Sequence, residues 1–218
     1  MTKVKDCTVG GTEGRKSQSK MEDETNEVSN QASYMLQADM NDNRIIYITG
    51  EINDQVATLV VARMLELNVN DPKGDILLLI NSDGGEVNAA MSIHECMTKL
   101  IHCDVATVCI GRAHSCGQFL LLSGTKGKRF ITENSFTLAH QVSAGTVGKL
   151  SEMEGQVAQI KIVEEILNRI YLERTKITKK QIGTIMSRDT YMNAQETLKW
   201  GIVDHIIKKS ADLYTRIS

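Results

Sequence analysis

The chain has 218 residues, enough to bury one substantial hydrophobic core. Its 25 Lys and Arg residues nearly balance 27 Asp and Glu residues, so the formal net charge is −2 at pH 7. This balance gives no indication of a surface that binds nucleic acid or anionic membranes. No apolar run approaches the roughly 20 residues that span a bilayer, and residues 1–30 lack the apolar core of a secretory signal. We therefore expect a cytoplasmic protein.

The cysteines and histidines do not follow the spacing of known metal sites. The five cysteines lack the C-x-x-C pairs of zinc ribbons and redox motifs, which favours free thiols in a reducing compartment. His94, Cys96, His102 and Cys103 fall on a predicted helix and its exit without paired ligand spacing. The sequence therefore predicts no metal and no cofactor.

The polarity of the chain changes at Arg44. Residues 1–43 are rich in charged and small polar residues and contain few large apolar ones, so we expect a mobile polar extension. The folded domain is predicted over 44–209, with a C-terminal tail at 210–218.

Strand-like and helix-like segments alternate within this domain. Strands are predicted over Arg44–Gly50, Ile76–Ile80, Val105–Ile110, Ser135–Ala139 and 201–207, and helices over Gln55–Leu67, Val87–Leu100 and Lys149–Thr175. Asn193 is a predicted N-cap of a further short helix. The alternation indicates an α/β domain with largely buried parallel strands. The helix over 149–175 is long enough to project beyond such a domain.

Ser115 is the first candidate catalytic residue. It follows the strand predicted to end at Ile110 and precedes the apolar run Phe119–Leu122, which places its hydroxyl at a helix N-terminus. Backbone N–H groups there favour the negative charge that develops in acyl transfer. A small residue in this position more often serves packing or capping, so the motif alone does not establish a nucleophile.

A serine nucleophile needs a base and a group that orients the base. His140 closes the predicted strand 135–139, and its imidazole can accept a proton near neutral pH. Asp189 lies in a predicted turn before Asn193 and would fix the imidazole tautomer. Considered singly, the two residues read as a core histidine and a turn aspartate. His114 is a poor base for Ser115, because adjacent side chains diverge along a turn.

Gly84 and Gly85 follow a buried strand and allow the backbone to approach a bound carbonyl closely. The backbone N–H groups of Gly85 and Cys116 would then form an oxyanion hole. A tight turn that requires positive φ is the equally weighted alternative for this Asp-Gly-Gly segment.

Together the segments resemble the Clp peptidase family, the proteolytic component of energy-dependent cytosolic proteases. The motifs occur in the family's order: Arg44–Tyr47, Gly50–Asp54, Ile80–Ser82, Gly84–Gly85, Cys109–Gly111, Gly124–Phe130, His140–Gln141 and Arg188–Asp189. The resemblance, which covers about Arg44 to Ile207, assigns Ser115 as nucleophile, His140 as base and Asp189 as the orienting carboxylate.

The same resemblance implies a crotonase-like spiral of ββα units with a projecting handle helix. It also implies paired sevenfold rings, with the active sites facing a closed chamber. An AAA+ ATPase would thread unfolded polypeptides into that chamber, and the peptidase itself would bind no ATP.

The chain departs from the family pattern at several positions near these motifs, among them Ser187, where the family often has an acidic residue beside Arg188. Cys116 replaces a methionine, His114 a small residue, and Asp83 and Val142 replace prolines. Two alternatives to an active peptidase are a dormant Clp-like assembly subunit and a crotonase-type thioester enzyme that uses the same glycine-rich site. The intact set of Ser115, His140 and Asp189 favours the peptidase over both.

Overall fold

The structure, a computed structural model, describes residues 44–143, 145 and 149–217. The predicted extension at 1–43 lies outside these residues. The described strands are β1 (Ile45–Ile52), β2 (Ile76–Gly85), β3 (Val105–His114), β4 (Arg129–Thr132), β5 (Phe136–Ala139), β6 (Thr190–Asn193) and β7 (His205–Ile207). The helices are α2 (Asp54–Asn70), α3 (Val87–Glu95), α4 (Cys116–Leu122), α5 (Leu150–Arg174), α6 (Lys179–Met186), α7 (Ala194–Lys199) and α8 (Ala211–Tyr214).

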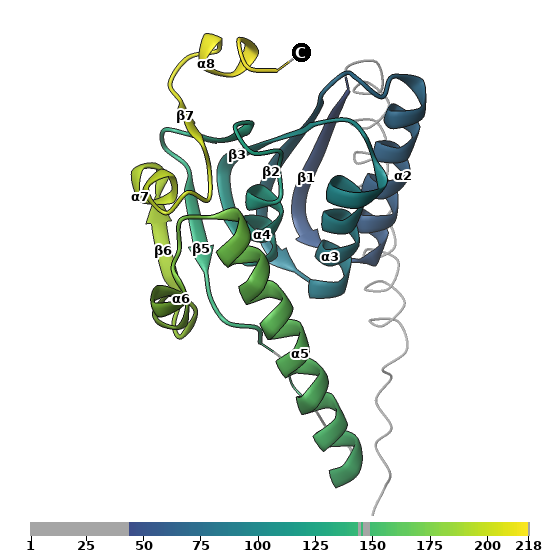
Figure 1. Ribbon diagram of the computed structural model, residues 1–218, viewed down its shortest axis with the longest axis vertical. Helices are drawn as coiled ribbons and strands as arrows, with labels where there is room; N and C mark the ends of the chain where they lie inside the picture. The colour runs from purple at the N-terminus through teal and green to yellow at the C-terminus, as the bar shows by residue number, and fades with distance from the viewer. Residues whose placement is uncertain (1–43, 144, 146–148, 218) are drawn as a thin grey trace, which may run out of the picture. The chain divides into compact units, whose positions relative to one another are not determined.

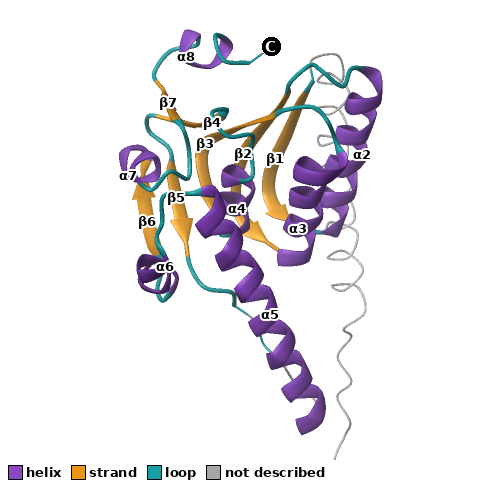
Figure 2. Ribbon diagram, in the orientation of Figure 1, coloured by secondary structure: helices purple, strands orange, loops and turns teal. Residues whose placement is uncertain are grey.

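The strands form one sheet whose main path runs β1-β2-β3-β4-β7 with parallel pairing throughout. The long strand β3 changes partner along its length: residues 107–109 pair with β4, and residues 112–114 pair with β5. Strand β6 then adds antiparallel to β5. Figures 1 and 2 show the antiparallel pair β5 and β6 standing beside the main sheet. This arrangement confirms the predicted α/β fold with mostly parallel strands.

Hydrophobic residues fill both faces of the sheet. The larger cluster unites alternate residues of β1, β2 and β3 with buried residues of α2, α3, α4 and the C-terminal part of α5. The smaller cluster on the other face contains Leu77, Val108 and Phe130, and Leu213 of α8 packs against it. α8 therefore contributes to the core from within the segment predicted as a tail.

Several element boundaries differ from the prediction for local reasons. Gly50, with φ of +73°, shifts the register of β1 instead of ending it, and the strand continues to Ile52. The helix predicted over 87–100 changes to a π-helix at Cys96. Gly201, with φ of +70°, keeps the chain in a turn, so β7 begins only at His205. By contrast, α5 spans 150–174, as predicted within one residue.

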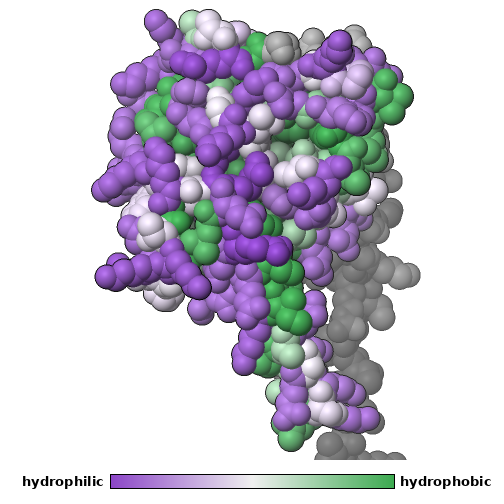
Figure 3. Space-filling view, in the orientation of Figure 1, coloured by the Kyte–Doolittle hydropathy of each residue, from purple (hydrophilic) through white to green (hydrophobic). Residues whose placement is uncertain are grey.

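The N-terminal part of α5 extends beyond the sheet (Figures 1 and 2). Leu150, Val157 and Ile162 on this helix are exposed, and Figure 3 shows hydrophobic and polar residues side by side along it. Within the described part of the chain, no helix combines the length and the apolar character that crossing a membrane requires, and α5 is long enough but too polar.

A buried ion pair joins three parts of the domain. The guanidinium of Arg129, at the start of β4, donates to both carboxylate oxygens of Asp204 at 2.8 and 2.6 Å. It also donates to the backbone oxygen of Arg174 at the end of α5, at 2.7 Å. Arg129 thus connects β4, the approach to β7 and the C-terminus of α5.

Candidate active site

Ser115 occupies the junction between β3 and α4 in an unusual backbone conformation. Its φ of 53° and ψ of −119° are rarely adopted by a residue with a side chain. The conformation is held from both sides, because the Ser115 N–H donates to Leu138 O at 2.9 Å and Ser115 O accepts from Phe119 N at 3.0 Å. Such strain is common at functional sites, and a sharp strand-to-helix turn exposes a nucleophile in hydrolases.

The glycines after β2 bring the backbone into direct contact with this turn. Gly84 and Gly85 have φ of +104° and +150°. A Cβ atom on Gly84 would lie 2.8 Å from Ser115 Cβ and 3.1 Å from Cys116 N. The segment therefore needs glycine both for its conformation and for its approach to Ser115. The tight-turn and functional interpretations of Asp-Gly-Gly are compatible here.

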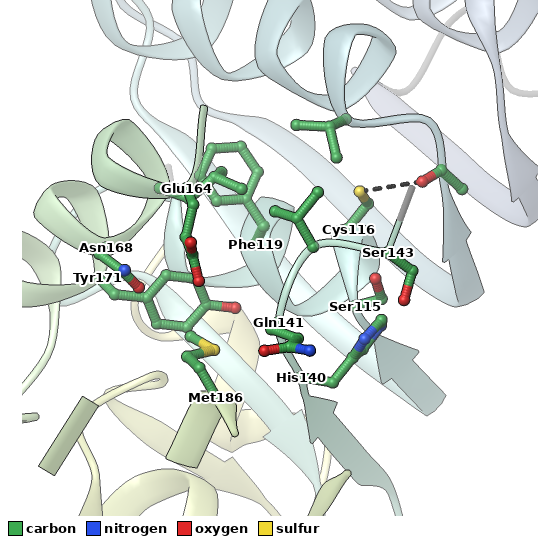
Figure 4. Close-up of a pocket in the computed structure, with 14 residues that line it drawn as sticks. Ser115, Cys116, Phe119, His140, Gln141, Ser143, Glu164, Asn168, Tyr171 and Met186 are labelled. Carbon is green, nitrogen blue, oxygen red and sulfur yellow. Dashed lines mark hydrogen bonds between the residues drawn. The ribbon is translucent and has the colours of Figure 1, made fainter. Parts of the chain in front are cut away.

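The Cys116 thiol connects the two segments. Its Sγ donates to Gly85 O at 3.2 Å, a contact drawn as a dashed line in Figure 4. Burial raises the pKa of this thiol, and the nearby hydrogen bonds offset the effect only in part. Cys116 is therefore a neutral hydrogen-bond donor at neutral pH and holds the Gly85 peptide beside the Ser115 turn.

We expect Gly84→Ala to lower kcat/KM of the reaction at Ser115 by about 100-fold, because the new methyl group displaces the Ser115 turn. Gly127→Ala is the matched control. Gly127 also has positive φ, +91°, but a Cβ there meets nothing within 4 Å. Steady-state assays of the two variants separate displacement of the Ser115 turn from the strain of a non-glycine residue at positive φ. Equal losses of kcat/KM in both variants would contradict the role given to Gly84.

A cavity of about 130 Å³ opens beside Ser115, and His140 forms part of its wall. His140 directly follows β5, and its side chain is half-buried. Figure 4 shows Ser115, His140 and Ser143 at one end of the cavity. Gly85 and Cys116 line it as well. The fold thus brings the predicted nucleophile, the predicted base and both predicted oxyanion-hole residues to one cavity.

Asp189 approaches His140 through the β5–β6 pairing. Ala139 is the register partner of Thr190, so His140 and Asp189 occupy the next position of the same antiparallel strand pair. Asp189 is exposed and does not line the cavity. Among the described residues, no hydrogen bond joins Ser115 to His140 or His140 to Asp189. Catalytic hydrogen bonds are often long or open before substrate binds.

Two departures from the family pattern are partners of each other. His114 Nδ1 lies 3.2 Å from Asp83 Oδ1, and Arg112 Nε lies 2.6 Å from the same oxygen. Burial lowers the pKa of His114, and the charge of Asp83 offsets this only in part. The His114 ring also contacts Tyr191 edge-on, with ring centroids 5.8 Å apart. These contacts tie the segment before Gly84 to the segment before Ser115.

A chain of buried hydrogen bonds, not anticipated from the sequence, links the elements around the site. Tyr171 of α5 donates to Gln118 Oε1 at 2.9 Å, and Gln118 Nε2 donates to Thr137 Oγ1 at 3.0 Å. Thr137 Oγ1 lies 3.0 Å from Thr197 Oγ1. The chain joins α5, α4, β5 and α7. No local sequence motif indicates these hydrogen bonds, because the residues that form them are far apart in the sequence.

Two of the four residues weighed as metal ligands, His94 and Cys103, have other side-chain contacts. His94 is buried in the core, with Nδ1 2.7 Å from Ser123 Oγ, and its pKa is lowered to about 4, chiefly by burial. Cys103 Sγ accepts from Arg44 at 3.3 Å. Within the described residues, no group of three or more His, Cys, Asp or Glu side chains could hold a metal ion.

A comparison with protein families is consistent with this geometry. The family model described as Clp protease matches residues 27–210, which is most of the chain. The chain belongs to the Clp protease family. The resemblance recognised from the separate motifs is thereby confirmed. The match begins at residue 27, whereas the resemblance based on motifs starts at Arg44. Membership of the Clp protease family supports a peptidase role, and the mixed α/β fold is consistent with that family's fold.

Proposed function

We propose that this chain is a serine endopeptidase in which Ser115 is the nucleophile, His140 the general base and Asp189 the residue that orients His140. The observation that carries the proposal is the strained Ser115 turn, held against Gly84 at the mouth of a cavity that His140 also lines. A serine, a base and nearby backbone N–H groups are the parts that acyl transfer requires.

In the proposed reaction, His140 removes the Ser115 proton as the oxygen attacks a peptide carbonyl carbon. The N–H groups of Gly85 and Cys116 stabilise the resulting oxyanion. His140 then donates the proton to the leaving amine, and the C–N bond breaks to leave an acyl-enzyme. A water molecule, deprotonated by His140, hydrolyses the ester and restores Ser115. No cofactor is needed for any step.

The proposal extends to the assembly and its partners. We infer that the chain forms sevenfold rings that pair around a chamber, and that a cytoplasmic AAA+ ATPase delivers unfolded polypeptides to it. The exposed apolar residues on the extending part of α5, Leu150, Val157 and Ile162, support self-association. The near-neutral charge supports polypeptide substrates over nucleic acid.

A serine-directed fluorophosphonate tests the proposal, because its reaction requires both an activated hydroxyl and an oxyanion site. We expect mass spectrometry of the labelled full-length chain to find one adduct, on Ser115, and no adduct in Ser115→Ala. An adduct on Ser143, which lines the same cavity, would reassign the nucleophile. No adduct on the wild-type chain would overturn the proposal and favour a dormant assembly subunit or a thioester enzyme.

A further inference from the structure

The cavity beside Ser115 has a place for one substrate side chain. In the proposed reaction, a peptide carbonyl attacked by Ser115 points its oxygen toward the N–H groups of Gly85 and Cys116, two residues that line the same cavity. The side chain on the Cα next to that carbonyl carbon is then the nearest group that can enter. We call this amino acid, on the N-terminal side of the cleaved bond, the primary residue.

The wall opposite Ser115 is largely apolar and carries Asn168 and one acidic group. Phe119, Leu167, Tyr171 and Met186 provide apolar and aromatic surface. Figure 4 shows Glu164 of α5 near Phe119, Asn168 and Tyr171, with its carboxylate directed into the space between the two rings. Glu164 is half-buried. It is the one acidic side chain among the described residues that line the cavity, and no lysine or arginine joins it there.

Glu164 has no partner of its own within the described residues. None of their hydrogen bonds or ion pairs involves its carboxylate, although Lys161 lies three positions earlier on α5. A carboxylate partly removed from water gains most from a cation that enters the same space. The geometry therefore leaves a negative charge available to a substrate.

We propose that Glu164 is a specificity-determining residue that makes lysine or arginine the preferred primary residue. The inference rests on the proposed peptidase function of the same site. The methylene groups of a lysine or arginine side chain would pack along Phe119, Leu167 and Met186, and its charged end would reach the Glu164 carboxylate. The planar guanidinium of arginine can donate two parallel N–H hydrogen bonds to the two carboxylate oxygens.

The test compares peptides that differ only in charge at the primary residue. Arginine is paired with citrulline, which has nearly the same shape without the charge, and lysine with norleucine. We expect kcat/KM of the assembled wild-type protein to favour each charged peptide by about tenfold. Glu164→Gln should lower both ratios to about one, and Glu164→Lys should reverse them. Raising the salt concentration should reduce the wild-type ratios, because ions screen the attraction.

Glu165→Gln is the matched control, because Glu165 is the next residue on α5, is exposed and does not line the cavity. It removes the same charge and should keep the wild-type ratios. Ratios near one in the wild type, or ratios unchanged in Glu164→Gln, would overturn the specificity role while cleavage of the neutral peptides still supported the peptidase. If none of the four peptides is cleaved and the fluorophosphonate forms no adduct, the proposed function is overturned instead.

Discussion

Ser115→Ala and His140→Ala should each lower kcat for peptide hydrolysis by about 10⁶-fold. The double variant should lose no more than either single variant, because a nucleophile without its base and a base without its nucleophile are equally ineffective. Asp189→Ala should lose less, about 10⁴-fold, since Asp189 acts only through the orientation of His140.

The measurement is single-turnover and steady-state hydrolysis of a fluorogenic peptide by each variant. Circular dichroism and sedimentation should match the wild type, because Ser115 and His140 are only half-buried and the substitutions leave no unpaired buried charge. Ser92→Ala is the control for loss of a serine hydroxyl elsewhere, on the exposed face of α3. Multiplying losses in the double variant would show that the two residues act independently, against the proposed mechanism.

We expect Asp204→Asn to lower the free energy of unfolding by about 3 kcal/mol. The Arg129 side chain is only 3% exposed, so the variant leaves a buried guanidinium without its counter-charge. Burial alone would raise the pKa of Asp204, but the hydrogen bonds and charge of Arg129 outweigh it and lower the pKa below its ordinary value of 3.8. The Asp204 carboxylate therefore contributes its full stabilisation at pH values above the ordinary pKa of 3.8. This contribution is lost as the pH falls through the lowered pKa.

Urea denaturation at fixed protein concentration measures the effect, and the difference between wild type and Asp204→Asn should narrow below about pH 4. The control is Glu133→Gln, which breaks an exposed pair in which Glu133 Oε1 lies 3.4 Å from Lys208 Nζ. Exposed pairs contribute about 1 kcal/mol or less. Equal losses in the two variants would contradict a special role for the buried pair.

Some of the site was readable from the sequence because its parts are local. Ser115 sits where a buried strand meets an apolar helical run, and the two glycines after β2 need no distant residue to signal a close backbone approach. The order of separate motifs was sufficient to indicate the family. The helical periodicity of apolar residues, which continues over a long stretch, likewise predicted α5 within one residue of its observed ends.

Other elements were missed because their signals are short or weak. β4 and β6 have four residues each, and strands this short are recognised unreliably, since β5 has the same length and was predicted. α6 did have a readable start, the capping box formed by Thr178 and Gln181. The proposed role of Asp189 depends on the β5–β6 register, which its own sequence neighbourhood does not reveal.

The sequence by itself determined the alternation of strands and helices, the candidate Ser115, His140 and Asp189, and the family, since each rests on residue type and local spacing. Only the tertiary structure decided which distant side chains meet. It paired Asp83 with His114, joined Tyr171 to Gln118, and directed Glu164 of α5 into the cavity beside Ser115. The physical reason is that contacts between distant segments follow from the packing of helices on a sheet, and no local pattern encodes that packing.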